Sequence, residues 1–239
     1  MKIYDVHNHL LPSVDDGPND ISESLEIVKI SSDQNIAFIL ATPHRKDVTE
    51  LYSVKHIKKL VNQINEIALD RGYITEIKLG MENHIDLSLP DDIRTGYALS
   101  MNEGPYILLE MPWEDEGLYI DDVLSEIQEM GLIPVIAHPE RMEIFMNDYD
   151  YLKNLVERGI LMQLTASSLY GKFGKEARVF SHEILLDGFC HIIASDTHMA
   201  VGQREQDLIK GFESAREIIG VESAVKLVSD NPRKLLNID

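Results

Sequence analysis

The sequence predicts an α/β fold built on parallel strands. Short apolar runs of strand length alternate along the chain with longer segments of helical periodicity. The runs are continuously apolar, which is typical of strands buried on both faces. Repeated βα units of this kind favour either an open doubly wound sheet or a closed barrel, and no glycine-rich dinucleotide or Walker loop follows the first run.

Seven runs are expected to form the strands. Each is short, and each lies between segments with turn or helix signals. In chain order they are KIYDVH (2–7), FILATPH (38–44), IKLGME (77–82), YILLEMP (106–112), LIPVIAHP (132–139), ILMQLTA (160–166) and HIIASD (191–196).

Helical patterns fill the intervals between these runs. The first, residues 20–35, offers Asp20 or Ser22 as an N-cap and places Leu25 and Val28 near helical spacing. Several of the later patterns end at glycine, a common residue at helix C-termini. The later helical segments are 51–72, 120–131, 148–159, 175–188, 211–220 and 222–230.

Composition and charge limit the possible partners. The chain has 239 residues, a length that suits one barrel domain or two small domains. Its 22 basic and 41 acidic residues give a net charge of −19, which disfavours nucleic acid and anionic lipid as partners. No apolar stretch approaches a membrane span, and the N-terminus does not resemble a signal peptide. With Cys190 as the one cysteine, we expect no internal disulfide, no thiolate metal site and a cytoplasmic location.

Ligand-type side chains stand at the ends of most predicted strands. In a βα barrel the chemistry lies at the carboxyl ends of the strands, so these positions are where functional residues are expected. Burying an unpaired charge is costly, which makes histidine and carboxylates unusual at the ends of apolar runs. Six of the seven runs carry them: His7 with His9, His44, Glu82, Glu110, His138, and Asp196 with His198.

These residue types together indicate a metal centre. Residues two apart in a strand face the same side, so His7 and His9 can share one ion. Imidazole nitrogen and carboxylate oxygen suit Mn, Fe, Zn or Mg. With Asp16 added, the nine candidate ligands are too many for one ion, and two or three are expected. Such a centre is typical of phosphoester hydrolysis.

Several segments resemble the PHP (polymerase and histidinol phosphatase) superfamily. Within it they most resemble the bacterial protein tyrosine phosphatases of capsule and exopolysaccharide operons, the CpsB/CapC type. The similarity runs in order from residue 3 to about residue 200. The segments that carry it are DVHNHLLPSVDDGP, ATPH, LLEMP, AHPER, SLYGKFG and IASDTH.

The resemblance implies a fold and a set of roles. The fold is a distorted (β/α)7 TIM-like barrel, so residues 1–239 are expected to form a single PHP metallophosphatase domain. The family holds three metal ions, often manganese, and a hydroxide that bridges them attacks phosphorus. Carried over by position, one ion is held by His7, His9, Glu82 and Asp196. A second shares Glu82 and adds Glu110 and His138, and a third is held by Asp16, His44 and His198.

Arginines are the expected phosphate ligands, because the guanidinium fork donates two hydrogen bonds. Arg141 in HPER matches a family arginine. Arg204 lies near the position of another, after a segment one residue longer than is usual in the family. Arg45, directly after His44, is open to two interpretations, phosphate binding or simple solvation, and solvation is slightly favoured.

The function implied by the resemblance is hydrolysis of phosphotyrosine on the tail of a bacterial tyrosine kinase that controls capsule or exopolysaccharide synthesis. A histidinol-phosphate phosphatase is the close alternative, and a metal-dependent amidohydrolase or deacetylase is the alternative from another class. A proofreading nuclease is disfavoured by the charge, and a non-enzymatic module would be expected to have lost ligands. Cys190 lacks the phosphate loop of a cysteine-based phosphatase. The oligomeric state is left open.

A few residues near these motifs have no assigned role. Asp15 is expected to support the loop or its histidines. The side chain of His84 is expected to face the same way as that of Glu82, two residues earlier, and Lys172 lies in the GKFG turn. For each of them, a place in the pocket and a structural role are both possible interpretations. The remaining histidines, His56, His182 and His191, are expected to be structural.

Overall fold

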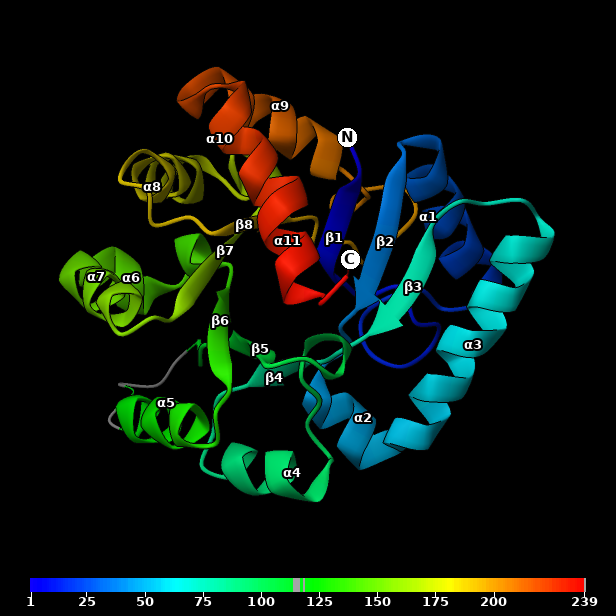
Figure 1. Ribbon diagram of the computed structural model, residues 1–239, viewed down its shortest axis with the longest axis horizontal. Helices are drawn as coiled ribbons and strands as arrows, with labels where there is room; N and C mark the ends of the chain where they lie inside the picture. Colours follow the sequence, from blue (N-terminus) through cyan, green and yellow to red (C-terminus); the bar gives the residue numbers. More distant parts are fainter. Residues whose placement is uncertain (114–116, 118, 239) are drawn as a thin grey trace.

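The structure is a computed structural model that describes residues 1–113, 117 and 119–238. Over these residues it contains eight strands in two parallel sheets, surrounded by helices (Figure 1). The first sheet has the order β1 (Ile3–Asn8), β2 (Ile36–Ala41), β3 (Glu76–Leu79). The second runs β4 (Glu82–His84), β5 (Tyr106–Glu110), β6 (Ile133–Ala137), β7 (Leu161–Thr165), β8 (Ile192–Ala194).

All seven predicted runs form strands, but the third forms two. The chain leaves the first sheet after Leu79 and enters the second at Glu82. Across this break the backbone stays paired with the chain that follows β2, because Gly80 N donates to Ala41 O and Glu82 N donates to Pro43 O. A single strand over 77–82 is therefore wrong, and Glu82 begins a strand instead of ending one.

Two isolated parallel bridges connect the sheets. One joins Asn8 at the end of β1 to Thr197 beyond β8, and the other joins His44 beyond β2, the central strand of the first sheet, to Glu82 in β4. The backbone of His9 also donates to Thr197 O at 2.8 Å, and that of Asp196 donates to His7 O at 2.9 Å. The two sheets are thus held together next to the predicted ligands.

The predicted helices are confirmed. They are α1 (Ile21–Asp33), α3 (Val54–Asp70), α5 (Ile120–Glu129), α7 (Tyr149–Glu157), α8 (Lys175–Leu186), α9 (Leu208–Ile219) and α10 (Val221–Val225). Asp20 caps α1 and accepts hydrogen bonds from the backbones of Ser22 and Glu23. A π-helical segment, 226–230, connects α10 to α11 (Asn231–Leu235).

Four short α-helices were not expected from the sequence. They are α2 (Arg45–Leu51), α4 (Leu89–Thr95), α6 (Glu143–Asn147) and α11. With five to seven residues, each has fewer than two turns, too few for an apolar period to show. None of the helices that the structure describes is long and apolar enough to cross a bilayer.

The core has two layers. One lies between the strands and the surrounding helices. The other lies on the inner face of the strands, where Val6, Leu108 and Val135 pack with Leu235 and Leu236 from the C-terminal segment.

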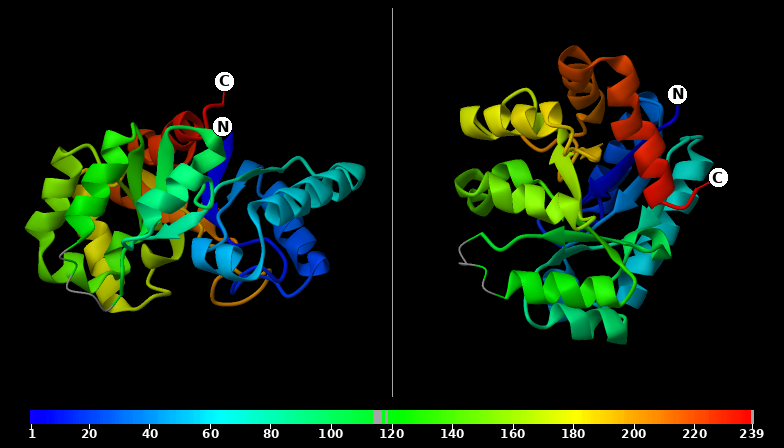
Figure 2. Two further views of the ribbon diagram at one scale, coloured as in Figure 1. Left: turned by 90° about the horizontal axis from the view of Figure 1, so that it is seen from below. Right: turned by 60° about the vertical axis from the view of Figure 1, so that its left-hand side comes forward.

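This C-terminal segment covers the amino ends of the strands. Ser229 Oγ donates to the carbonyl of Lys2, before β1, and Asn231 Nδ2 donates to that of His191, before β8. Figure 2 shows α11 and the N-terminus on the same side of the molecule. The carboxyl ends of the strands lie at the other end of the inner core, and they carry the predicted ligands.

Candidate metal centre

Glu82 stands at the centre of the predicted ligand set. Its carboxylate is 1% exposed, and its Oε2 lies 3.3 Å from His7 Nε2, 3.2 Å from His9 Nε2 and 3.2 Å from His44 Nδ1. Its Oε1 lies 2.9 Å from His138 Nε2. Burial raises the pKa of Glu82, but the charge of His7 and the hydrogen bonds of the imidazoles outweigh it and hold the pKa well below its usual range. One carboxylate thus lies within ion-pair distance of four imidazoles.

His7 and His9 are oriented as metal ligands. His7 Nδ1 lies 2.7 Å from Gln163 Oε1, and His9 Nδ1 lies 2.7 Å from Asp15 Oδ2, so both Nδ1–H groups have acceptors. In its neutral form each imidazole then carries a lone pair on Nε2. Burial lowers the pKa of both imidazoles, but the nearby carboxylates outweigh it and raise the pKa, so a proton is favoured there when no cation is bound. The two Nε2 atoms lie 3.1 Å apart and close to Glu82. Their lone pairs and the carboxylate repel one another unless a cation or a proton lies between them. The donor set therefore fits a divalent metal ion.

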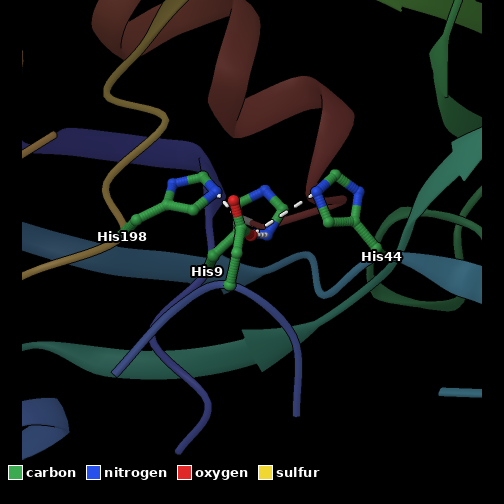
Figure 3. A group of neighbouring side chains, drawn as sticks. His9, His44 and His198 are labelled. Carbon is green, nitrogen blue, oxygen red and sulfur yellow. Dashed lines mark ion pairs between the residues drawn. The ribbon is translucent and has the colours of Figure 1, made fainter. Parts of the chain in front are cut away.

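A second group of ligand atoms surrounds Asp16. Its Oδ1 lies 3.0 Å from His198 Nε2, 3.6 Å from His44 Nε2 and 4.0 Å from His9 Nδ1. Figure 3 shows the imidazoles of His9, His44 and His198 turned toward a shared point. Burial and the neighbouring His9 lower the pKa of His198 to about 4, so this imidazole is neutral near pH 7 and free to donate a lone pair.

A third group includes Glu110. Its Oε1 lies 3.8 Å from His138 Nε2 and accepts a hydrogen bond of 3.1 Å from Trp113 Nε1. Among the described residues, three sets offer ligand atoms within 4.8 Å of one another. They are His7 with His9 and Glu82; His9 with Asp16, His44 and His198; and His44 with Glu82 and Glu110.

These sets resemble the predicted ligand sets without matching them fully. The structure brings all nine candidate side chains to one place, but it groups His44 with both Asp16 and Glu82 and links His9 to two sets. His138 and Asp196 border the sets through Glu82 and His7 respectively. The assignment of each residue to one ion stays a prediction.

Two of these residues have strained backbones. His138 has φ 37° and Asp196 has φ 56°, so both occupy the left-handed region that residues other than glycine seldom adopt. His138 directly follows β6 and Asp196 lies two residues beyond β8, so both stand at the carboxyl ends of the strands. Strained conformations of this kind are typical of functional sites.

The two predicted arginines also converge on the centre. Arg141 Nη1 lies 2.9 Å from Asp196 Oδ2, and Arg204 Nη2 lies 2.9 Å from Asp196 Oδ1. Arg204 Nη1 also pairs with Asp16 Oδ2 at 3.1 Å. Burial raises the pKa of Asp196, but His7 and both arginines outweigh it and lower the pKa far below its usual range. The arginines therefore border both the carboxylates and the adjoining cavity.

Asp15 acquires a role from its hydrogen bonds. Besides His9 Nδ1, its carboxylate accepts from the backbone N–H of His44 at 3.1 Å and of Gly17 at 3.0 Å. It therefore positions two candidate ligands at once, as expected for a supporting residue. Gly17 is needed because a Cβ there would lie 2.0 Å from His9 O. This close approach explains the glycine of DDGP.

Arg45 is neither solvated nor beside the two arginines of the centre. Its side chain is 2% exposed and donates to Asp86 at 2.6 Å, to the carbonyl of His84 at 3.1 Å, and to Asp92. It ties α2 to the segment between β4 and α4. The solvated interpretation is wrong, because the guanidinium is buried against acidic partners. These partners lie more than forty residues away, so no local pattern indicates them.

The other residues left open mostly have structural contacts. Lys172 pairs with Glu205 at 3.1 Å, and His84 Nδ1 lies 3.7 Å from Glu110 Oε2. His182 hydrogen-bonds to the carbonyl of Leu169, and His191 Nδ1 accepts from the backbone of Met162.

A cavity of about 530 Å³ opens over the metal centre. Sequence reasoning missed its apolar walls, which include Trp113, Met146 and Phe173. Cys190, in contrast, is buried in the core, where burial raises the pKa of its thiol. A cysteine nucleophile is thereby excluded, as the sequence predicts.

Comparison with known proteins gives the family of the chain. The family description "Capsular polysaccharide synthesis, CpsB/CapC" matches residues 3–237. The tyrosine-protein phosphatase YwqE of Bacillus subtilis (strain 168) is 33% identical over 194 residues, which make up 81% of this chain and 76% of YwqE.

The fold has both near and distant counterparts among solved structures. One of the crystal structures of YwqE from Bacillus subtilis and CpsB from Streptococcus pneumoniae, described as unique metal-dependent tyrosine phosphatases, is 31% identical and matches with a TM-score of 0.92. The match covers 98% of this chain and 94% of that one. A 5-methylcytosine deaminase from Klebsiella pneumoniae is 10% identical with a TM-score of 0.62, covers 99% of this chain and 74% of its own, and shares the fold alone.

Proposed function

Because the chain belongs to the CpsB/CapC family of capsular polysaccharide synthesis proteins, we propose that it is a metal-dependent tyrosine-protein phosphatase. The observation that carries the proposal is the facing pair of His7 and His9 Nε2 atoms, 3.1 Å apart beside the buried Glu82. Two arginines at the edge of the same cavity supply the phosphate-binding groups.

The centre is proposed to hold three divalent ions, manganese in preference to Fe, Zn or Mg. The oxygen and nitrogen donors suit all four, and the three overlapping sets of ligand atoms support the count. The holders are His7, His9, Glu82 and Asp196; Glu82, Glu110 and His138; and Asp16, His44 and His198. Bound ions supply Lewis acidity, which polarises the phosphoryl group and makes water acidic enough to act as a nucleophile near neutral pH.

The chain's own residues bind and orient the phosphate. Arg141 and Arg204 each present a planar guanidinium to the cavity, and Asp196 fixes both at 2.9 Å. A tetrahedral phosphate placed there meets two forks whose positions are already set, so little conformational entropy is lost on binding. Gln163 and Asp15 keep the His7 and His9 protons on Nδ1, leaving each Nε2 to face the centre.

The proposed substrate is phosphotyrosine on the tail of a bacterial tyrosine kinase that controls capsule or exopolysaccharide synthesis. The family description and the activity named for YwqE support this choice. A cytoplasmic location is part of the same proposal, and the unpaired Cys190 is compatible with it.

We also propose that residues 1–239 form one domain, a distorted (β/α)7 barrel. The parallel bridges Asn8–Thr197 and His44–Glu82 support closure, because they join the first sheet to both edge strands of the second, β8 and β4. The inner layer of apolar side chains supports it as well. Since β3 and β4 come from one predicted run, eight strands are compatible with seven βα units.

A direct assay tests the proposed activity. The purified chain is loaded with Mn, Fe, Zn or Mg and given a phosphotyrosine peptide, histidinol phosphate, para-nitrophenyl phosphate and a chromogenic amide. We expect turnover of the peptide, loss of activity with a chelator, recovery with manganese, and at least two ions per chain by elemental analysis. His56→Ala, which removes an exposed histidine on α3, is the control and should behave like the unmodified chain.

Three results would overturn the proposal. Turnover of histidinol phosphate without action on the peptide would identify the alternative phosphatase, and amide hydrolysis without phosphatase activity would identify an amidohydrolase. Full activity in a chain stripped of metal would contradict the metal centre itself.

A further inference from the structure

The cavity over the metal centre has aromatic side chains on either side of a phosphate-binding arginine. The guanidinium carbon of Arg141 lies 4.6 Å from the ring centroid of Phe173 and 5.8 Å from that of Trp113, above the face of each ring. Phe173 comes from the loop before α8, and Trp113 follows β5. Both rings line the cavity together with Arg141, so the phosphate-binding guanidinium has an aromatic ring on two sides.

Trp113, one wall of the cavity, is held in place by contacts with residues of the metal centre. Trp113 Nε1 donates to Glu110 Oε1 at 3.1 Å, and its ring lies nearly parallel to that of His138, with centroids 6.0 Å apart. Even so, the indole is 52% exposed, an unusual degree for a tryptophan that is fixed by a hydrogen bond.

The turn of the chain holds the opposite wall. Phe173 lies between Gly171, with φ 91°, and Gly174, with φ 96°, two positions that favour glycine. The preceding residue, Lys172, anchors the loop through its ion pair with Glu205 and a hydrogen bond to the carbonyl of Gly202. The Phe173 ring is half-buried and keeps part of its surface toward the cavity.

We propose that Trp113 and Phe173 form a slot for the phenyl ring of the substrate and make the enzyme selective for aryl over alkyl phosphate monoesters. This inference rests on the proposed phosphatase activity. With its phosphate on Arg141, a phosphotyrosine places its ring directly outward from the phosphate, between the two aromatic walls. Ring-to-ring packing and burial of the apolar ring favour binding there.

An alkyl phosphate has nothing to fill the slot. In phosphoserine the phosphate is joined to the peptide backbone by one methylene group, so the polar backbone would have to enter between the aromatic walls. Its N–H and C=O groups would then lose water without gaining partners, which is unfavourable. The slot therefore favours phosphotyrosine, whose phosphate is attached to a phenyl ring, over phosphoserine, whose phosphate lies close to the polar backbone.

Phe173 is the residue to change, because Trp113 touches Glu110. In Phe173→Ala, the ratio of kcat/KM for a phosphotyrosine peptide to that for the matching phosphoserine peptide should fall about 10-fold, mainly through KM for the aryl substrate. Phe173→Tyr, which keeps the ring, should restore most of the ratio. Leu186→Ala, an exposed apolar change on α8, is the matched control and should leave both substrates unaffected.

Inhibition provides a second measurement that does not depend on slow turnover. Phenylphosphonate and methylphosphonate differ only in the ring. In Phe173→Ala, the inhibition constant of phenylphosphonate should rise about 10-fold, while that of methylphosphonate stays within about twofold.

The outcomes separate the slot from its alternatives. Equal losses for aryl and alkyl compounds would show that Phe173 acts only by packing on Arg141, and an unchanged ratio would show that the ring is not contacted; either result overturns the slot. If the unmodified chain hydrolysed no phosphate ester while methylphosphonate and phenylphosphonate still bound, the proposed function would fail separately from the slot.

Discussion

The two ends of the strands bury very different side chains. At the carboxyl ends, Glu82 lies among four imidazoles within 3.3 Å. At the amino ends, Leu235 and Leu236 pack into an apolar layer with Met101. Buried charges require partners, whereas buried aliphatic groups favour folding by themselves. This fold therefore places stabilising apolar contacts at the amino ends of the strands, and the carboxyl ends can hold a cluster that is destabilising but reactive.

The largest expected effect comes from removing the central charge at the carboxyl ends. Glu82→Gln keeps the shape of the side chain but loses the charge that balances His7, His9 and His138. We expect kcat/KM for a phosphotyrosine peptide to fall by at least about 10³-fold, because metal ions contribute several kcal/mol to catalysis of this kind. Steady-state kinetics and metal content per chain measure the effect.

The matched change is Glu66→Gln, at an exposed position on α3. It should leave activity and metal content unchanged. A Glu82→Gln variant that retained its full metal content and activity would contradict the central position of this carboxylate.

A change at the amino ends of the strands should lower the stability of the fold and leave the activity unchanged. Leu236→Ala leaves a cavity in the inner apolar layer, and the free energy of unfolding should fall by about 3 kcal/mol. Activity per folded molecule should be unchanged. Urea unfolding followed by circular dichroism gives the stability, and assays well below the transition give kcat. Leu69→Ala, at a residue 76% exposed, is the control. A fall in kcat without loss of stability would show that the two ends are coupled.

The smallest of these effects is expected at Asp15. Asp15→Asn keeps a carbonyl acceptor for some of the three donors but loses the charge beside His9. Manganese affinity and kcat/KM should each fall about 10- to 100-fold, as is usual for residues that orient metal ligands. Isothermal titration with manganese measures the affinity independently of turnover. Asp70→Asn, at the exposed end of α3, serves for comparison, and unchanged affinity in Asp15→Asn would remove Asp15 from the supporting residues.

Most of the fold could be predicted from local patterns. The apolar runs gave the strands, because strands buried on both faces need continuous apolar sequence. The same reasoning failed at residues 77–82, where the apolar run passes from one sheet to another. Continuity of hydrophobicity reports burial, and burial continues across Gly80 although the chain passes from the sheet of β1 and β2 to the sheet of β5. The short helices α2, α4 and α6 were missed because tertiary contacts, such as the Arg45 pairs with Asp86 and Asp92, support them.

The candidate ligands were predictable, and their supports were only partly so. Histidine, glutamate and aspartate at strand ends stand out against apolar neighbours, which is why eight of the nine candidates could be selected there, with Asp16 added from the loop after the first strand. The structure brings all nine together, and metal binding by each of them stays a prediction. Gln163 was missed, although a polar side chain within the apolar run ILMQLTA is itself a signal of a buried partner. Trp113 and Phe173 gave no such signal, because an aromatic residue in a loop can serve a core, a surface or a pocket. Only the spatial position of Arg141 distinguishes these possibilities.

The left-handed backbones of His138 and Asp196 have a consequence for engineering. Glycine would relieve the conformational cost at either position, commonly of order 1–3 kcal/mol. At Asp196 the loss of the ion pairs with Arg141 and Arg204 offsets this gain. At His138 a thermostability screen would favour a replacement that deletes a candidate ligand, so selection for heat resistance and selection for turnover pull in opposite directions there. Libraries aimed at a more robust enzyme should hold both positions fixed and seek their gains at the amino ends of the strands.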